Sequence, residues 1–462
     1  MLLETIRADR AITFEKLSQL VALRSVHAEL GSGDGDSSAA SYAAAARWVF
    51  DEFAALGFDC TMFDCADGSQ AIYGFKPARI PASSPESAPT VLLYSHFDVV
   101  GPGEESGWAH PPFQLTRVPG SERWSGRGAA DCKGAVVMHL TALRALCKLE
   151  EELGAPSCNI KVIVEGSEEN GGRGLRELVR EQPDLLEADT IFIADTGNVA
   201  VGVPTLVTML RGSAQIRVRL DTLASPAHSG KFGGGAPDAV AALIRILDSL
   251  HDTAGNTVID GVDCTAQWAG EPYDPERFRA DAGLLDGVEL LGSDSADQVW
   301  ARPAITFTGF SSTPVEQAVN AIPPHAEAQL NLRVPPGLGM NTREVAQKVI
   351  EHLEARVPWG AHFSAEILSA SQFFTADTDS KALSLLKEAL SNSYGRDTAL
   401  VGTGGSIPLT VELAEAYPRA TIALFGVQDA GADIHSTQES VDPAEIEHIA
   451  AAEAEFLLRC GR

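Results

Sequence analysis

TVLLYSHFD, at residues 90–98, joins a short apolar run to a histidine and an aspartate. Three similar runs lie at residues 160–164, 190–194 and 421–425, and an apolar-periodic helix is expected at 134–149, between the first run and the second. Short apolar runs that alternate with helices are typical of a buried, mostly parallel sheet. The sequence therefore predicts an α/β fold whose main domain contains a mixed, mostly parallel sheet.

The middle of the chain follows a different pattern. Residues 215–220, QIRVRL, alternate between polar and apolar as a strand with one solvated face does. The further elements expected here are a helix at 237–250, strands at 304–308 and 326–333, a helix at 342–356 and a strand at 362–368. This order is β-α-β-β-α-β, a ferredoxin-like antiparallel sheet backed by two helices. We therefore expect an inserted domain at residues 207–370, which divides the main domain into residues 1–206 and 371–462.

The composition limits the partners of the protein. Its 35 basic and 63 acidic residues give a net charge of −28, which disfavours binding to nucleic acid and to anionic membrane surfaces. No segment approaches the ~20 apolar residues of a membrane helix, and the first residues lack the pattern of a signal peptide. The seven cysteines are scattered without a CxxC pair, which argues against a disulfide framework or a thiolate zinc site. We expect a cytoplasmic protein with reduced thiols.

Acidic and histidine side chains follow all four apolar runs. They are His96, Asp98, Glu168, Glu169, Asp195 and, ten residues after its run, His435. A further acid, Asp131, comes just before the helix expected at 134–149. Ligands of open α/β sheets bind outside the carboxyl ends of the strands, so these side chains should converge on one crevice.

So many carboxylates in one crevice would repel one another unless cations were present. Histidine and carboxylate ligands suit Zn²⁺, Mn²⁺ or Co²⁺, and a carboxylate can bridge two metals about 3.5–4 Å apart. In the adjacent Glu168 and Glu169, one side chain can bind metal while the other accepts a proton from the attacking water. Each residue alone has a commoner structural explanation, but their joint occurrence predicts a hydrolase with two divalent metal ions, most simply Zn²⁺.

Taken together, these motifs resemble those of a known peptidase family. HFD at 96–98, GRGAADCKG at 126–134, the two adjacent glutamates, Asp195 and IHS at 434–436 occur in the order found in carnosinase-like dipeptidases. That family also includes carboxypeptidase G, aminoacylase and succinyl-diaminopimelate desuccinylase. The resemblance extends from near Glu15 to the end of the chain. It implies a catalytic domain, a lid domain that often mediates homodimerisation, and a small peptide substrate.

The resemblance also implies a role for each candidate residue. The metal ligands would be His96, Asp131, Glu169, Asp195 and His435, with Asp131 as the bridge. His96 and Asp195 would complete one metal site, and Glu169 and His435 the other. Glu168 would be the general base, and Asp98 would orient His96. The peptide bond after Asp131 is often cis in such proteins.

The substrate contacts implied by the resemblance lie outside the metal motifs. His228, in AHSG at 227–230, resembles the lid histidine that reaches the other subunit's active site and stabilises the tetrahedral oxyanion. Asn320 and Arg333 align with a polar lid contact and with the arginine that holds the substrate carboxylate. Gly405 and Ser406, in GGSIP at 404–408, resemble the dipeptidase loop that holds the substrate C-terminus.

Two positions depart from the carnosinase-like pattern. Thr403 stands where many of these enzymes carry an acid that meets the substrate's free amine, and Cys132 replaces an aspartate that need not touch metal. The GGSIP loop and the chain length favour a dipeptidase, but Thr403 leaves an N-acyl amino acid amidohydrolase as the alternative. A binding protein without catalysis is disfavoured because the base and all ligand candidates are present. A serine hydrolase and a nucleotide enzyme are disfavoured because the chain contains neither G-x-S-x-G nor a phosphate-binding G-K-[ST] motif.

Overall fold

The computed structural model describes residues 1–27, 30, 35–79, 88–405 and 407–461. This part of the chain forms two compact units. Unit 1 consists of Met1–Thr208, Ala376–Val401 and Pro408–Arg462, and unit 2 of Met209–Thr375 and Gly402–Ile407. The sequence pattern predicts boundaries after residues 206 and 370, and it does not assign Gly402–Ile407 to the inserted domain.

Most strands of unit 1 belong to a large mixed sheet whose order begins β1-β2-β6-β3-β7-β18-β9. These strands are β1 (Asp59–Asp64), β2 (Gln70–Lys76), β3 (Thr90–His96), β6 (Asn159–Glu165), β7 (Thr190–Ile193), β18 (Thr421–Leu424) and β9 (Thr205–Leu210). The central strands β6, β3, β7 and β18 are parallel, whereas β1, β2 and β9 pair antiparallel at the sides. The four central strands contain the four apolar runs, and the predicted mixed α/β fold is confirmed.

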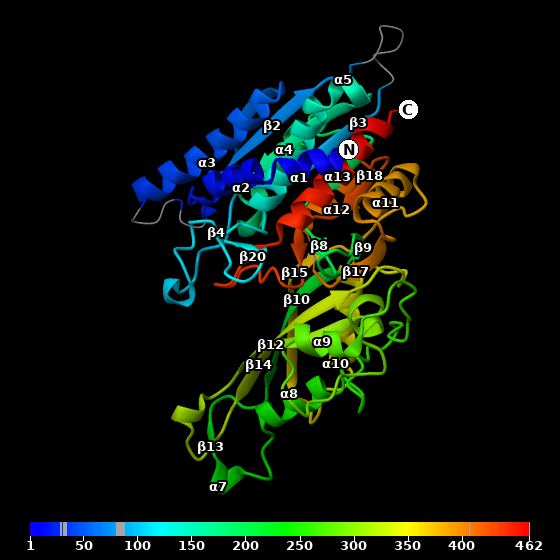
Figure 1. The fold of residues 1–462 in the computed structure, drawn as a ribbon. Helices are drawn as coiled ribbons and strands as arrows, with labels where there is room; N and C mark the ends of the chain where they lie inside the picture. The colour runs from blue at the N-terminus through cyan, green and yellow to red at the C-terminus, as the bar shows by residue number, and fades with distance from the viewer. Residues whose placement is uncertain (28–29, 31–34, 80–87, 406, 462) are drawn as a thin grey trace. The chain divides into compact units, whose positions relative to one another are not determined.

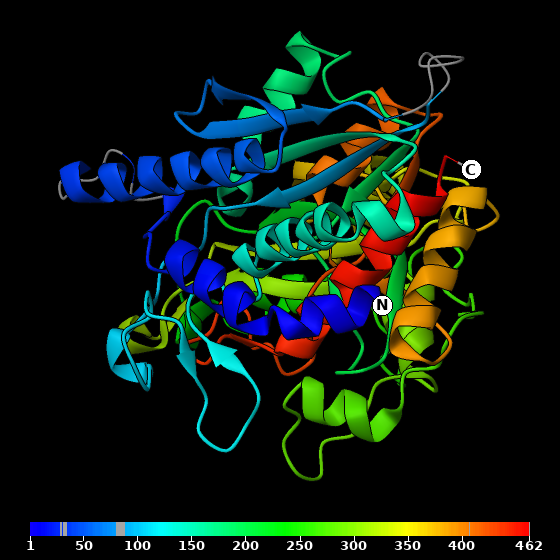
Figure 2. The same ribbon diagram turned by 45° about the horizontal axis from the view of Figure 1, so that its top comes forward.

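Helices cover both faces of this sheet. They are α1 (Leu2–Ala8), α2 (Arg10–Val21), α3 (Gly35–Ala55), α4 (Lys133–Lys148), α5 (Glu150–Leu153), α6 (Arg173–Glu181), α11 (Lys381–Tyr394), α12 (Pro408–Ala416) and α13 (Pro443–Arg459). The crossover from β3 to β6 through α4 and the crossover from β6 to β7 through α6 run in opposite directions along the sheet. Because such crossovers are right-handed, α4 and α6 lie on opposite faces. Figures 1 and 2 show α13 beside α4.

Small residues allow α4 and α13 to pack closely. Gly134, Ala135 and Ala142 of α4 are buried, as is the alanine-rich middle of α13. Between the two helices, His139 Nδ1 lies 2.7 Å from Glu453 Oε2, and both side chains are buried. The packing fixes α4 on β3, so that the residues just before α4 are held close to the end of that strand.

Unit 2 has an antiparallel sheet in the order β12-β14-β10-β15. Its elements follow one another as β10 (Gly212–Asp221), α8 (Ala239–Asp248), β12 (Ala304–Ser311), β14 (His325–Val334), α10 (Thr342–Glu354) and β15 (His362–Ser371). Every second residue of β10 is buried, including Ile216 and Val218, against α8 and α10. The order is the β-α-β-β-α-β that the sequence predicts. The structure adds α9 (Pro275–Asp281) and the π-helix η5 (Asp297–Ala301) between α8 and β12.

Shorter elements complete both units. They are β4 (Thr116–Arg117), β5 (Trp124–Ser125), β20 (Ser440–Val441), β8 (Gly197–Asn198), β19 (Gln428–Asp429), β17 (Ala399–Thr403), β11 (Ala227–His228), α7 (Ser229–Phe232), β13 (Ala321–Ile322), β16 (Phe374–Thr375), and the 3-10 turns η3 (Glu105–Gly107), η4 (Glu168–Asn170) and η6 (Val315–Gln317). All seven cysteines are free thiols. No helix in the described ranges is both long and apolar enough to cross a membrane.

Candidate metal centre

Three parallel strands of unit 1 bring the predicted site residues to one edge of the sheet. His96 is the last residue of β3 and pairs with Glu165, the last residue of β6. The turn η4 follows β6 and carries Glu168 and Glu169. Asp195 comes two residues after β7. Because these strands are neighbours, their carboxyl ends place the side chains together, as expected for an α/β sheet.

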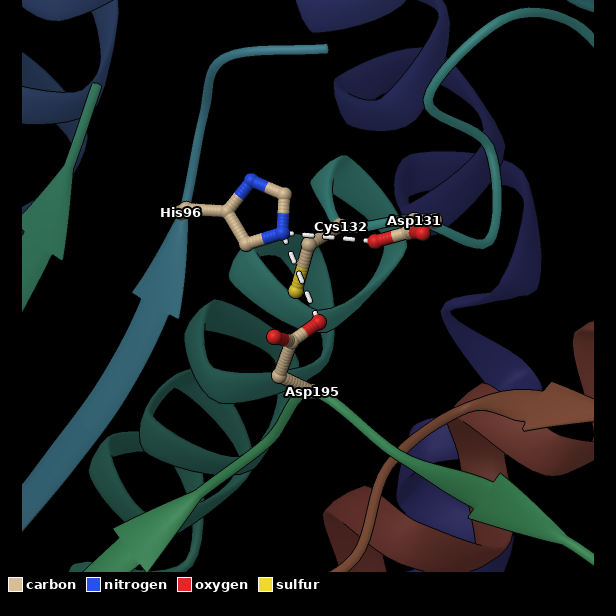
Figure 3. Close-up of side chains that lie close together, drawn as sticks. All are labelled: His96, Asp131, Cys132 and Asp195. Atoms are coloured by element: carbon tan, nitrogen blue, oxygen red, sulfur yellow. Dashed lines mark ion pairs between the residues drawn. The ribbon is translucent and has the colours of Figure 1, made fainter. Parts of the chain in front are cut away.

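A first group of possible metal ligands surrounds His96 (Figure 3). His96 Nε2 lies 3.3 Å from Asp131 Oδ1 and 3.4 Å from Asp195 Oδ1. The imidazole is completely buried, and its Nε2 makes no hydrogen bond to any described residue. A buried nitrogen that faces two carboxylates and makes no hydrogen bond is the arrangement expected of an imidazole that binds a metal ion.

A second group consists of Asp131, Glu169 and His435. His435 Nε2 lies 3.1 Å from Asp131 Oδ2 and 3.2 Å from Glu169 Oε1. His435 is the exposed member of this group, whereas Asp131 is buried. Asp131 therefore directs Oδ1 toward the first group and Oδ2 toward the second, and it is the one residue common to both groups among the residues described.

Asp98 connects the strand end that carries His96 to the turn that carries Glu168 and Glu169. Its Oδ1 accepts a hydrogen bond from the backbone N–H of Glu168 at 3.1 Å, and its Oδ2 accepts one from Glu169 N–H, also at 3.1 Å. His96 Nδ1 lies 3.0 Å from the Asp98 carbonyl oxygen and 3.3 Å from Asp98 Oδ1. Asp98 thus contacts both His96 and the turn that carries the two glutamates.

The electrostatics of the centre are unfavourable without cations. Burial, with a smaller contribution from Asp195, raises the pKa of Glu168 to about 9. Burial also raises the pKa of Asp195 to about 6. Burial acts in the same direction on Asp131, but the contacts with the His435 and His96 imidazoles outweigh it and hold its pKa well below the usual range. Divalent cations would relieve this repulsion, so the donor set and its geometry fit metal binding.

The structure places Cys132 closer to the possible metal ligands than the sequence pattern predicts. Its Sγ belongs to the first group, in which all potential ligand atoms lie within 4.8 Å of one another (Figure 3). The thiol donates a hydrogen bond to Ala194 O at 3.2 Å, and burial raises its pKa to about 12. This hydrogen bond directs the thiol toward the carbonyl of Ala194. The Asp131–Cys132 peptide bond is cis, as the resemblance implies.

Unit 2 brings His228 and Asn320 together. β11 pairs with β13, so that His228 is opposite Ala321, and Ser229 N–H donates a hydrogen bond to Asn320 O at 2.9 Å. His228 Nδ1 accepts a hydrogen bond from Gly230 N–H at 3.1 Å. Figure 1 shows β13 and α7 at one end of this unit. An exposed imidazole with one nitrogen fixed by the backbone is well placed for an external ligand.

Arg333 lies at the other end of β14, and sequence reasoning missed its neighbour, Arg211. Arg211 is 7% exposed, and its Nε has no hydrogen-bond partner among the described residues. Burial, with a contribution from Arg333, lowers the pKa of Arg211 to about 10. A Cβ built on Gly404 would lie 2.7 Å from Arg211 Nη2, so the glycine leaves room for the guanidinium. The sequence signal that could have indicated Arg211 is its position as a charged residue directly after the apolar run of β9.

The loop beside Arg211 contains the other substrate candidates. Gly405 N–H donates a hydrogen bond to Thr403 Oγ1 at 3.4 Å. Thr403 therefore contacts its own loop, where an acid was expected from the resemblance. Ser406 lies outside the described residues.

Comparison with known proteins identifies the family. Residues 92–459 match Peptidase family M20/M25/M40. A cysteinylglycine-S-conjugate dipeptidase of Corynebacterium striatum is 49% identical over 459 residues, which cover 98% of this chain and 96% of the relative. The chain belongs to this family. As an M20 peptidase it is a hydrolase that acts on peptide bonds, and the resemblance found in the motifs is confirmed.

More distant relatives agree with this assignment. Cys-Gly metallodipeptidase dug1 of Schizosaccharomyces pombe is 28% identical over 375 residues, which cover 77% of this chain and 76% of the relative. The crystal structure of human carnosine dipeptidase 1 superimposes with a TM-score of 0.74 at 22% identity, covering 99% of this chain and 98% of that one. The latter shows that the M20 dipeptidase fold is shared.

Proposed function

We propose that the protein is a metal-dependent dipeptidase that binds two divalent cations, most simply Zn²⁺. The observation that supports this best is the Asp131 carboxylate, whose two oxygens face His96 and His435 at 3.3 and 3.1 Å. A shared carboxylate between two histidine-containing groups is the arrangement of a dinuclear hydrolase. The curated relatives named above, which are dipeptidases, favour the same function.

The cations and the residues around them would have separate roles in the reaction. When bound, the cations would supply Lewis acidity to the scissile carbonyl and to the attacking water. Glu168 belongs to neither ligand group, so its carboxylate is available to take the water's proton and to deliver it to the leaving amine. Asp98 keeps Glu168 and His96 oriented through the contacts described above.

Unit 2 carries the groups suited to the substrate carboxylate. Arg333 donates to Asn331 Oδ1 at 3.1 Å, and no ion pair joins it or Arg211 to a carboxylate within the described ranges. Two guanidinium groups without an acidic partner favour an anionic ligand, and a planar guanidinium binds a carboxylate in a bidentate manner. We propose that they hold the C-terminal carboxylate of a dipeptide.

A dipeptide panel tests this function. We expect metal-loaded protein to hydrolyse Cys-Gly, its S-conjugates and other Xaa-Gly peptides, and to lose activity about 100-fold or more when the C-terminal carboxylate is amidated, because about 3 kcal/mol of charge-assisted bonding is removed. Release of glycine or glycinamide measures both rates. Because Thr403 replaces an acid, N-acetylated dipeptides belong in the same panel. Faster cleavage of an N-acyl amino acid than of any dipeptide would favour the amidohydrolase instead.

His228 cannot serve the same site as Arg333 within one subunit. His228 lies beside the start of β14 and Arg333 near its end, and the eight residue steps from His325 to Arg333 span about 26 Å at ~3.3 Å per step. We therefore propose that His228 acts on the partner's substrate in a homodimer. Exposed apolar residues on and after the edge strand β12, namely Phe307, Phe310, Val315 and Val319, favour a covered surface here.

Mixing two inactive variants tests this arrangement. We expect His228→Ala and Glu168→Ala each to be inactive alone, and to recover about one quarter of wild-type activity after subunit exchange at equal amounts. Half of the randomly formed dimers are mixed, and each mixed dimer has one intact site of two. Activity and light-scattering mass are measured on the same sample. A dimer that shows no recovery after exchange would assign His228 to its own subunit.

A further inference from the structure

A buried carboxylate connects the two loops that carry the metal-ligand candidates. β5 pairs with β20, which places Ser125 opposite Ser440. Ser125 Oγ and Gly126 N–H both donate to the carbonyl oxygen of Glu439, at 2.8 and 3.2 Å. The backbone of Glu439 is thereby fixed to the segment that leads to Asp131, which lies 308 positions away in the sequence.

The Glu439 side chain is saturated with donors from the Asp131 loop. Its Oε1 accepts hydrogen bonds from Ala130 N–H and Asp131 N–H, each at 3.1 Å. Its Oε2 accepts one from Gly128 N–H at 3.1 Å and one from Arg127 Nη1 at 2.5 Å. Since a carboxylate offers about four acceptor positions, each one is used, and the side chain is fully buried.

Arg127 extends the connection to the other loop. Its Nη2 donates to Ser436 O at 3.1 Å, one residue after His435. The guanidinium is 1% exposed at the side chain and lies 5.3 Å from the centre of the Trp108 ring. The Arg127–Glu439 pair therefore contacts the backbone of Asp131 on one side and the residue next to His435 on the other.

We propose that Glu439 is a positioning residue that, through Arg127, sets the separation of Asp131 and His435 and thereby the affinity of the centre for divalent cations. This inference rests on the metal binding in the proposed function. Hydrogen bonds to a charged acceptor are roughly twice as strong as neutral ones, so the three from the backbone N–H groups of Gly128, Ala130 and Asp131 hold this loop in one place. In metalloproteins generally, replacing a residue that holds a metal ligand in position without touching the metal weakens metal binding about 10–100-fold.

Glu439→Gln is the decisive variant. Glutamine has the same shape, but its NH₂ group would face two donors whichever way the amide is turned. We expect the dissociation constants for Zn²⁺ and Mn²⁺, measured by calorimetry on full-length protein, to rise about 10–100-fold. We also expect the visible absorption of the Co²⁺-loaded protein to change, because the ligand geometry changes.

Glu453→Gln is the matched control. Glu453 is equally buried, and its Oε2 lies 2.7 Å from Nδ1 of His139, but among the described residues it contacts neither ligand loop. We expect this variant to lower the melting temperature while cation affinity and the Co²⁺ spectrum stay as in the wild type. Arg127→Lys is a second test if Glu439→Gln fails to fold, since it keeps the charge but removes the bond to Ser436 O; it should weaken cation binding as well.

Three results are distinguishable. Wild-type affinity and an unchanged Co²⁺ spectrum in the folded Glu439 or Arg127 variant would overturn the positioning role. Equal weakening in Glu453→Gln would also overturn it, because general destabilisation would then explain the effect. A wild-type protein that binds the cations but cleaves no dipeptide contradicts the proposed substrate, while the comparison of cation affinities still decides the role of Glu439.

Discussion

Glu168→Gln is expected to lower kcat for dipeptide hydrolysis by about 10²–10⁴-fold without changing the cation content of the protein. Glutamine keeps the volume of the side chain and the backbone contact with Asp98, but it cannot accept a proton. Glu168 is absent from both ligand groups, so the cations lose no donor. Steady-state kinetics on a cleaved dipeptide and elemental analysis after dialysis measure the two quantities.

The adjacent residue provides the contrast. Glu169 belongs to the second ligand group, with its Oε1 3.2 Å from His435 Nε2. Glu169→Gln should therefore lose cation as well as activity, and excess Zn²⁺ or Mn²⁺ should restore part of its rate. Excess cation should not restore Glu168→Gln. If Glu168→Gln retains a tenth of the wild-type kcat, another group must be the base.

Much of the centre could be predicted because most of the site residues closely follow a strand in the sequence, and neighbouring parallel strands end at the same edge of the sheet. The apolar runs mark β3, β6 and β7, and parallel neighbours must place their carboxyl ends at one edge. His96, Glu169 and Asp195 could therefore be grouped without coordinates. The alternating pattern of β10 likewise predicted a strand with one buried face, since its side chains point to opposite sides in turn.

The features that were missed depend on long-range contacts. β1 and β2 pair antiparallel at the edge of the sheet, although their partly buried residues give only a weak pattern. α3 begins at Gly35, where the glycine- and serine-rich sequence has no apolar periodicity that would indicate a helix. Glu439 resembles any acid of a polar loop until its contact with Asp131 N–H is seen. Burial of a charged residue against distant backbone donors leaves no signal in a single sequence.

Asp131→Asn is expected to remove both cations, with a loss of activity of about 10³-fold or more, equivalent to several kcal/mol of charge stabilisation. The amide keeps one weak acceptor and replaces the other oxygen with a donor. One of the two groups would then face an NH₂, and the charge that both cations share would be lost. Cation content after dialysis and calorimetric titration with Zn²⁺ measure the effect.

Asp195→Asn separates this shared role from an ordinary ligand role. Asp195 Oδ1 faces His96 Nε2 at 3.4 Å and belongs to the first group alone. Its replacement should weaken one binding step and leave the step at Glu169 and His435 in place, whereas Asp131→Asn should weaken both. Equal stoichiometry in the two variants would mean that the Asp131 oxygens, although directed to different histidines, serve a single cation.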